Sequence, residues 1–176
     1  YLTASTLLNQ HISVKDVAGS HLPSLSRDKS GDTSIDPGTK TLGFEFHLHI
    51  PSGSAAYTHH GNSRTIPVGN QVICQKLNEQ GTHGIGVYLD STPLAEPSGT
   101  LRIVVSSGSL HASCSMKVQK GGWSHICAQY NKTPSVSKVQ LYRDSTYITA
   151  SNMVEMNDFG FAETPFTIGA GSTHYF

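Results

Sequence analysis

Polar and apolar residues alternate with a period of two along most of the chain, and this pattern constrains the fold more than any other feature. In GFEFHLHI (43–50) the Phe, Leu and Ile residues occupy every second position, with Glu and His between them. LHASCSMKV (110–118) repeats the pattern. Successive side chains of a β-strand point to opposite faces, so both segments are predicted to be strands with one buried face and one more solvent-exposed face.

Several further segments have the length and the β-branched or aromatic content of strands. Clusters of Gly, Pro, Asn and Ser separate them at short intervals, which is typical of an all-β sandwich or barrel. The segment 5–19 is expected to hold at most one short helix, because its β-branched residues and caps are poor helix signals. The additional predicted strands are 71–77, 84–90, 100–106, 122–130, 137–144 and 165–170.

We therefore predict an all-β fold in which two antiparallel sheets pack face to face over 42–172. Alternation selects the side chains that should be buried between the sheets. They are Phe44, Phe46, Leu48, Ile103, Cys114, Ile126, Leu141 and Ile168.

Charge and hydropathy exclude two classes of partner. Twelve basic residues balance twelve acidic ones, so no net charge attracts the chain to nucleic acid or an anionic membrane. Apolar residues form no run of about 18, which is the length needed for a membrane-spanning helix. We expect no nucleic-acid binding and no membrane insertion.

The chain begins at Tyr1 rather than Met and stops at Phe176, directly after a predicted strand. We interpret it as a single domain excised from a longer polypeptide. In this interpretation 1–41 supply an N-terminal strand and a polar loop that pack on the domain, and 42–176 form the sandwich.

The cysteines are Cys74, Cys114 and Cys127, each in an apolar, strand-like segment. An odd count does not suit a closed disulfide framework, and a buried thiol packs as a small hydrophobic group. We expect three reduced, mostly buried thiols. The alternative is a Cys114–Cys127 disulfide with Cys74 left free.

Three motifs in the second half of the chain resemble the laminin-G-like members of the concanavalin A-like lectin/glucanase superfamily. These are GGWSHICAQYN, KVQLYRDS and FTIGAG, and GFEFHLHI resembles the Phe-rich opening strand of that family. The resemblance covers about 42–172 and implies a jelly-roll sandwich of two antiparallel sheets. The matching residues are Gly122, Trp123, His125, Ala128, Tyr130, Val139, Leu141, Tyr142, Asp144, Phe166, Ile168 and Gly169.

One residue departs from the family pattern. The turn after Tyr142 usually contains Gly, but Ser145 stands here. Without the access of glycine to positive φ, the turn is expected to take another type. The resemblance also implies that Trp123 packs at the end of a sheet, in the core.

The resemblance further suggests which chemistry is missing. Glucanases of the superfamily carry alternating carboxylates on one strand face, and no predicted strand here has them, so we expect no enzyme and no catalytic residues. Calcium-binding relatives have Asp where this chain has Ser106, or Ser107 after a one-residue slip. A neutral hydroxyl is a poor calcium ligand, so we expect no metal and no cofactor.

Ten histidines is a high number for this length. His47 and His49 share one strand face, a spacing that can chelate zinc, and His111 or His125 could lie on a neighbouring strand. No third ligand is evident from the spacing, so we interpret these histidines as half-exposed sheet residues.

The segment 51–70 is predicted to be a long loop inserted between two core strands. Long loops inside compact domains are usually functional or disordered, and side chains suited to recognition gather here. If this segment is only a connection, recognition is expected on the sheet face near His111 and His125. The candidate ligand-binding residues are Tyr57, His59, His60, Asn62 and Arg64.

We expect a non-catalytic recognition module of a large multidomain protein that binds a protein segment through sheet-end loops. The free thiols favour an intracellular scaffold. The alternative is an extracellular or virion lectin-like adhesion domain that binds a glycan. A third possibility is a spacer that contacts only neighbouring domains of its own chain.

Overall fold

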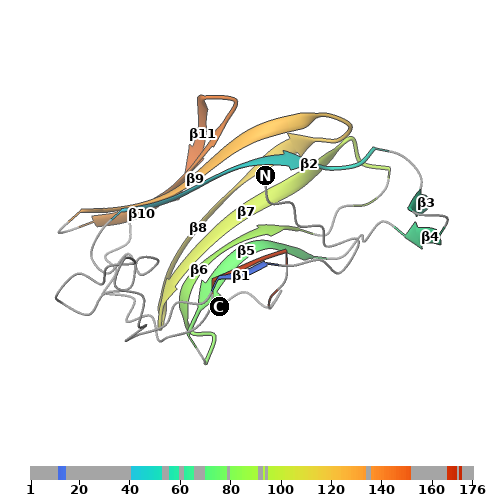
Figure 1. Cartoon of the computed structure of the whole chain (residues 1–176). Helices are drawn as coiled ribbons and strands as arrows, with labels where there is room; N and C mark the ends of the chain where they lie inside the picture. The colour runs from blue at the N-terminus through green and yellow to red at the C-terminus, as the bar shows by residue number, and fades with distance from the viewer. Residues whose placement is uncertain are drawn as a thin grey trace, which may run out of the picture.

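The structure is a computed structural model of the chain (Figure 1). It describes residues 41–52, 70–78, 80–90, 93, 95–132, 137–151, 166–169 and 171, and the backbone alone of 12–14, 56–59, 62–65, Thr133 and Val136.

Every regular element in the described part is a β-strand, and all pairings are antiparallel. A six-stranded sheet has the order β1-β12-β5-β6-β7-β8, a four-stranded sheet has the order β11-β10-β9-β2, and β3 pairs with β4. The prediction of an all-β sandwich of two antiparallel sheets is confirmed. The strands are β1 (Ile12–Val14), β2 (Leu42–His49), β3 (Ala56–His59), β4 (Asn62–Thr65), β5 (Gln71–Leu77), β6 (His83–Leu89), β7 (Ser98–Ser107), β8 (Leu110–Gln119), β9 (Trp123–Thr133), β10 (Val136–Arg143), β11 (Thr146–Ala150) and β12 (Phe166–Ile168).

The segment considered for a short helix contributes a strand instead where it is described. Ile12–Val14 forms β1, which pairs with β12 at one edge of the six-stranded sheet. β-branched residues suit a pleated strand better than a helix, which agrees with this outcome. Within the described ranges no helix is long and apolar enough to cross a membrane.

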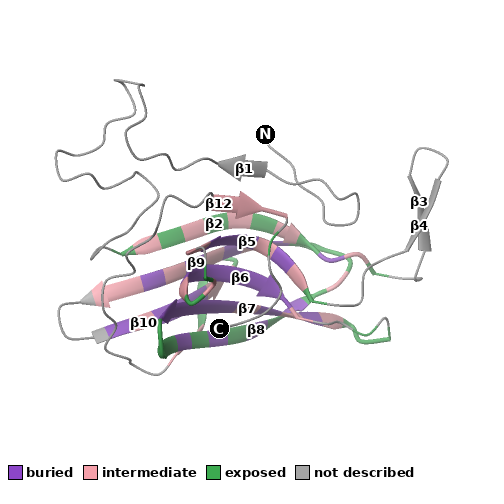
Figure 2. Cartoon of the chain, turned by 90° about the horizontal axis from the view of Figure 1, so that it is seen from below, coloured by how far each residue is buried: buried purple, intermediate pink, exposed green. Residues whose placement is uncertain are grey.

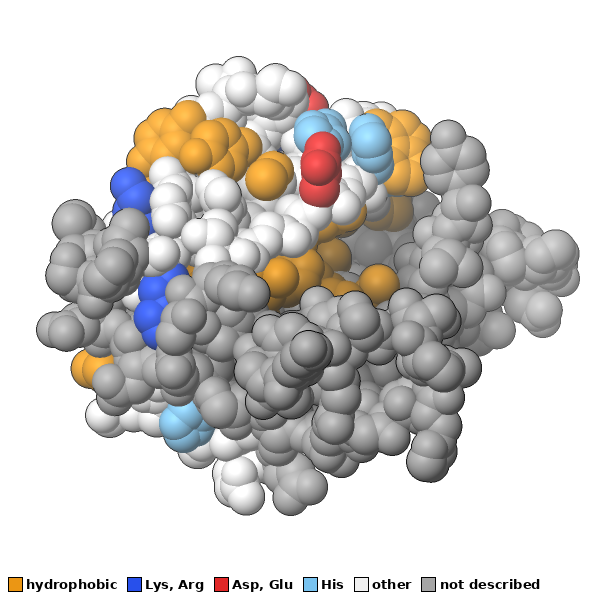
Figure 3. Space-filling model, turned by 60° about the vertical axis from the view of Figure 1, so that its left-hand side comes forward, with side chains coloured by type: hydrophobic (Ala, Val, Ile, Leu, Met, Phe, Trp, Pro, Cys, Tyr) orange, Lys and Arg blue, Asp and Glu red, His pale blue; other side chains and the backbone are white. Residues whose placement is uncertain are grey.

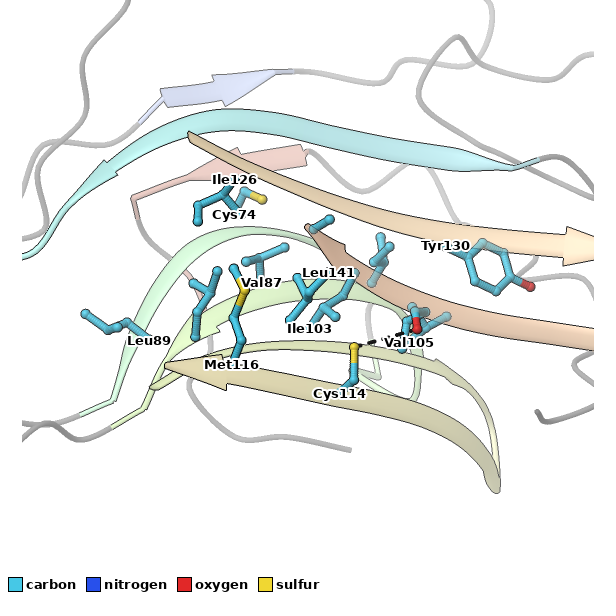
Figure 4. Packing of buried hydrophobic residues seen from close by; sticks show 14 of the residues in the cluster. Cys74, Val87, Leu89, Ile103, Val105, Cys114, Met116, Ile126, Tyr130 and Leu141 are labelled. Atoms are coloured by element: carbon cyan, nitrogen blue, oxygen red, sulfur yellow. Dashed lines mark hydrogen bonds between the residues drawn. The ribbon is translucent and has the colours of Figure 1, made fainter. Parts of the chain in front are cut away.

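The main core lies between the two sheets, where side chains from both inner faces interdigitate (Figure 4). Ile103, Ile126 and Leu141 are fully buried, and Cys114 is buried as well, as alternation predicts. Exposed and buried residues alternate strictly along β8 after its first residue, and Figure 2 shows the same stripes.

The other four predicted core residues are only half-buried. Phe44, Phe46 and Leu48 in β2, and Ile168 in β12, pack against the core without being enclosed by it. The physical reason is position: β2 is the last strand of its sheet and β12 lies near the edge of the other. Full burial was therefore the wrong prediction for this side of the sandwich.

The two sides of the sandwich close differently. On one side Arg143 of β10 donates a hydrogen bond of 2.8 Å from Nη1 to the backbone carbonyl of Lys117 in β8. The Cys114 thiol also donates to the carbonyl of Val139, at 3.6 Å. On the other side, among the residues that the structure describes, the rings of Phe44 and Phe166 stack with centroids 5.4 Å apart. The inward-facing side chains of β2 and those of β12 are half-buried, so they are less enclosed than the side chains of the central strands.

A second, smaller cluster lies on the other face of the six-stranded sheet. It consists of Val72, Tyr88 and Val104. The phenol ring of Tyr88 lies over Gly86, where an added Cβ would collide with it. All residues of β6 from Gly84 to Leu89 are therefore buried, on both faces of the strand.

The turn between β10 and β11 contradicts the expectation drawn from Ser145. Asp144 and Ser145 both have positive φ, 50° and 64°, which is the geometry of the type I′ hairpin turn. The turn is anchored to β9, because the Asp144 N–H donates to the His125 carbonyl at 2.9 Å. The His125 N–H in return donates to the Asp144 carboxylate at 3.0 Å. Serine adopts the conformation for which glycine is favoured.

Candidate functional site

The segment proposed for recognition contains a hairpin rather than a plain loop. β3 and β4 pair in register, with Tyr57 opposite Arg64 and His59 opposite Asn62 along the backbone. His60 lies outside the described residues. The prediction that 51–70 form a long loop is wrong at β3 and β4, which pair as strands. The recognition role of the five residues stays a prediction.

A different group of side chains gathers on the outer face of the four-stranded sheet. The register of β2 with β9 places His47 opposite His125, and His49 opposite Trp123. Residues directly opposite in an antiparallel pair have adjacent side chains on one face. Both pairs are in contact: the His47 and His125 ring centroids are 5.0 Å apart, and those of His49 and Trp123 are 5.2 Å apart.

Glu45 completes this group. Its Oε1 lies 2.8 Å from Nε2 of His125, whose side chain is 30% exposed, while the Glu45 side chain is 71% exposed. The pair is a hydrogen bond for neutral imidazole and an ion pair for the protonated ring. The carboxylate fixes the orientation of His125, and His47 covers the ring from the neighbouring strand.

Trp123 is 72% exposed, so the expectation that it packs in the core is wrong. Its neighbour Ser124 and then Ile126 point into the sandwich, so Trp123 and His125 point outwards. An exposed indole has a large apolar surface that a partner can cover.

A second aromatic pair lies further along the same face. The rings of Tyr142 in β10 and Tyr147 in β11 meet edge to face, with centroids 5.6 Å apart, and Tyr147 is 54% exposed. Tyr142 is opposite Cys127 of β9. Cys127 and Trp123 are four positions apart on β9, so the two aromatic pairs are about 13 Å apart along the strand.

We call this set of side chains the outer strip. It has aromatic groups at both ends and histidine and carboxylate groups in the middle. Figure 3 shows acidic and histidine side chains gathered on one face with hydrophobic side chains on both sides of them. The outer strip consists of Glu45, His47, His49, Trp123, His125, Tyr142 and Tyr147.

His111 belongs to another surface. It is exposed on β8, on the outward face of the six-stranded sheet, whereas His125 faces outwards from the four-stranded sheet. The alternative prediction that His111 and His125 mark one sheet face is therefore wrong. Of the histidines singled out, His47, His49 and His125 share a surface.

The three cysteines are free thiols, so the alternative Cys114–Cys127 disulfide is not formed. Burial raises the pKa of Cys74 to about 12 and that of Cys114 to about 11. Burial also raises the pKa of Cys127, and the negative charge of Glu45 adds to this effect. Thiols with raised pKa values are protonated near neutral pH and are poor nucleophiles.

Ser106, the position considered for calcium, has a structural role. It is fully buried, and its single hydroxyl proton is shared between the carbonyls of Thr82 and Gly108, at 2.9 and 3.3 Å from Oγ. These bonds tie the turn before β6 to the turn after β7. Across the part of the chain that is described, no three His, Cys, Asp or Glu residues are grouped so as to hold a metal ion.

Comparison with known proteins gives no match: no family model, no curated protein and no solved structure is similar to this chain. The site is defined by its own geometry, as an exposed aromatic strip on a sheet face.

Proposed function

We propose that this chain is a non-catalytic recognition module that binds a protein segment. In this proposal it is a laminin-G-like jelly-roll sandwich of the concanavalin A-like superfamily, embedded in a larger protein. The motifs around Trp123, Leu141 and Ile168 support the family proposal, and the sandwich of two antiparallel sheets is compatible with it.

The observation that carries the recognition proposal is the exposure of large aromatic groups on a regular sheet. Trp123 and Tyr147 are more than half exposed although both have ring partners on neighbouring strands. Trp and Tyr are the residues most often found at binding hot spots, because they bury a large area at little entropic cost. The sheet holds them in fixed positions before a partner arrives.

A glycan is the second candidate ligand, and the composition of the outer strip favours it specifically. Two aromatic pairs about 13 Å apart along the strand could each stack on an apolar sugar face. Between them, Glu45 and His125 offer acceptors and donors for hydroxyl groups. The same face therefore suits an extended sugar chain as well as an extended peptide.

The experiment screens the protein against a peptide display library and a glycan array. Binders of the wild type are then measured with Trp123→Ala and Tyr147→Ala. We expect each variant to lose at least about tenfold in affinity, as truncating a hot-spot aromatic does. The melting temperature should change little, because surface substitutions alter stability by about 0.5 kcal/mol or less. His111→Ala, on the other sheet, is the matched control and should bind normally.

A third variant distinguishes binding at the outer strip from binding at the hairpin of β3 and β4. In it a Gly/Ser connector replaces residues 53–69, which include Tyr57 and Arg64. If the connector variant loses binding while Trp123→Ala binds normally, recognition occurs at the hairpin and the outer strip is not the site. If the wild type binds neither library, the module is a spacer and the recognition proposal fails.

A further inference from the structure

Within the described residues, strand β2 is an edge strand, and its own sequence lacks several of the features that usually protect one. In the described part of the chain it has a single paired neighbour, β9, and the register between the two runs without a shift from Leu42 to His49. Native edges are commonly protected by Lys, Pro, bulges or short length. β2 has eight residues and contains no Lys, no Pro and no register shift.

The other long edge is protected. β8 ends the six-stranded sheet, but Arg143 donates to its Lys117 carbonyl, and Cys114 contacts β10. Lys117 also projects from its exposed face. β11, the opposite edge of the four-stranded sheet, has only five residues. β1, the remaining edge of the six-stranded sheet, has three residues. Of these four edges, β2 is the one best suited to receive another strand.

The apolar side chains of β2 are also incompletely covered. Leu42, Phe44, Phe46 and Leu48 point inwards but are only half-buried. A strand added beside β2 would place a second row of side chains next to this row and remove its remaining contact with water.

We propose that β2 pairs antiparallel with β2 of a second copy of this chain, with Phe46 on the two-fold axis. Antiparallel pairing about an axis perpendicular to the sheet keeps each copy's outer face on the same side. The two-fold axis must therefore pass between the two copies of one and the same residue. The neighbouring side chains determine which residue that is.

Charge and shape select Phe46. With Phe46 opposite Phe46 of the partner subunit, Glu45 lies opposite His47 of the partner subunit, twice by symmetry. Phe44 then lies opposite Leu48 of the partner subunit, which joins the two apolar rows. Centring on Glu45 would oppose two carboxylates, and centring on His47 would oppose two imidazoles and use only five residues of β2.

Gly43 adds complementarity of shape between the two copies of β2. In this register His49 lies opposite Gly43 of the partner subunit. Nothing lies within 4 Å of the position that a Cβ at Gly43 would occupy. The open space at Gly43 can accept an imidazole that already contacts Trp123. The dimer would join two outer strips into one continuous surface.

The test is sedimentation velocity of the 176-residue chain without any ligand. The concentrations run from about 1 to about 300 micromolar, because interfaces of this small size bind in that range. We expect a concentration-dependent dimer. His47→Glu places like charges opposite each other twice and should weaken the dimer at least about tenfold. His111→Glu, an equally outward histidine on β8, should leave it unchanged.

The charge-swapped variant Glu45→Lys/His47→Glu tests the register, because it recreates an attractive pair and should restore the dimer. Disulfide formation gives a second readout. Gly43→Cys/His49→Cys should cross-link two chains under mild oxidant, whereas either single variant should not, since like positions would be about 20 Å apart.

A wild type that is monomeric over the whole range overturns the proposal. A dimer that resists His47→Glu, or that the charge swap does not restore, overturns the Phe46-centred register. Because His47 and Glu45 are exposed, the variants should fold normally, which thermal melting verifies. The assay contains no ligand, so its result is independent of whether the module recognises a peptide or a glycan.

Discussion

Replacing Ser145 by glycine should stabilise the protein. Asp144 and Ser145 both have positive φ, and a non-glycine residue in that region costs about 1–2 kcal/mol. Glycine removes the cost at position 145 but gives the unfolded chain more freedom, which costs about 0.5–1 kcal/mol. The expected net gain is about 0.5–1 kcal/mol. Asp144 is left unchanged because its carboxylate and N–H hold the backbone of His125.

For a chain of this size a change of 1 kcal/mol shifts the melting temperature by about 2–4 °C, so Ser145→Gly should melt about 1–4 °C higher. Urea unfolding with linear extrapolation gives the free energy directly. The matched control is Ser109→Gly in the turn after β7, where φ is not positive. The free energy of unfolding of that variant should fall by about 0.4–1 kcal/mol, because glycine gives the unfolded chain more conformational freedom. Equal effects of the two substitutions would refute the reasoning from backbone conformation.

Three further outcomes are expected. Gly86→Ala should destabilise by about 1–3 kcal/mol, because the new methyl group collides with the Tyr88 ring; a normal urea midpoint would contradict this packing. Buried thiols have raised pKa values, about 12 for Cys74 and about 11 for Cys114, so unfolding releases their protons above pH 9 and stability should fall as pH rises from about 9 to about 11. Urea unfolding at pH 8 and pH 10.5 measures this, and a flat profile would count against it. EDTA should leave the melting temperature within about a degree, since a metal that binds only the folded state must stabilise it; a drop that Ca²⁺ or Zn²⁺ restores would show a metal site.

Alternation was sufficient to predict the sheets, because one buried face imposes a period of two on each strand. It placed Ile103, Ile126 and Leu141 in the core, where the structure has them. It could not distinguish a central strand from an edge strand. Phe44 and Phe46 follow the same pattern but are half-buried, because strand order is set by long-range pairing.

The outer strip was predictable in part. His47 and His49 were expected on one exposed face, but only the register of β2 with β9 shows that His125 and Trp123 lie opposite them. The sequence did contain a signal for Trp123. Trp123 is two positions from His125 and three from Ile126, so alternation places its side chain on the outer face with His125. Alternation here outweighs the family motif that suggested a core position.

Turn conformation was the least accessible feature. Ser145 gives no local signal for positive φ, because serine avoids that region on its own. The conformation is imposed by the strands on either side, whose right-handed twist is matched by a type I′ turn. The hairpin likewise consists of backbone pairing between β3 and β4, which alternation in 51–70 did not predict.

The burial of β6 on both faces has a consequence for how the molecule opens. Amide hydrogens exchange with solvent through openings whose free energy depends on the apolar contacts that must be broken. When β6 separates, Val87 and Tyr88 lose apolar contacts on opposite faces of the six-stranded sheet. When β2 separates, Phe44 and Phe46 lose fewer contacts, because their side chains are only half-buried. The amides of β6 should therefore exchange only through global unfolding, while those of β2 exchange through a smaller fluctuation. The outer strip therefore combines side chains of β2, the strand expected to open first, with side chains of β9, β10 and β11.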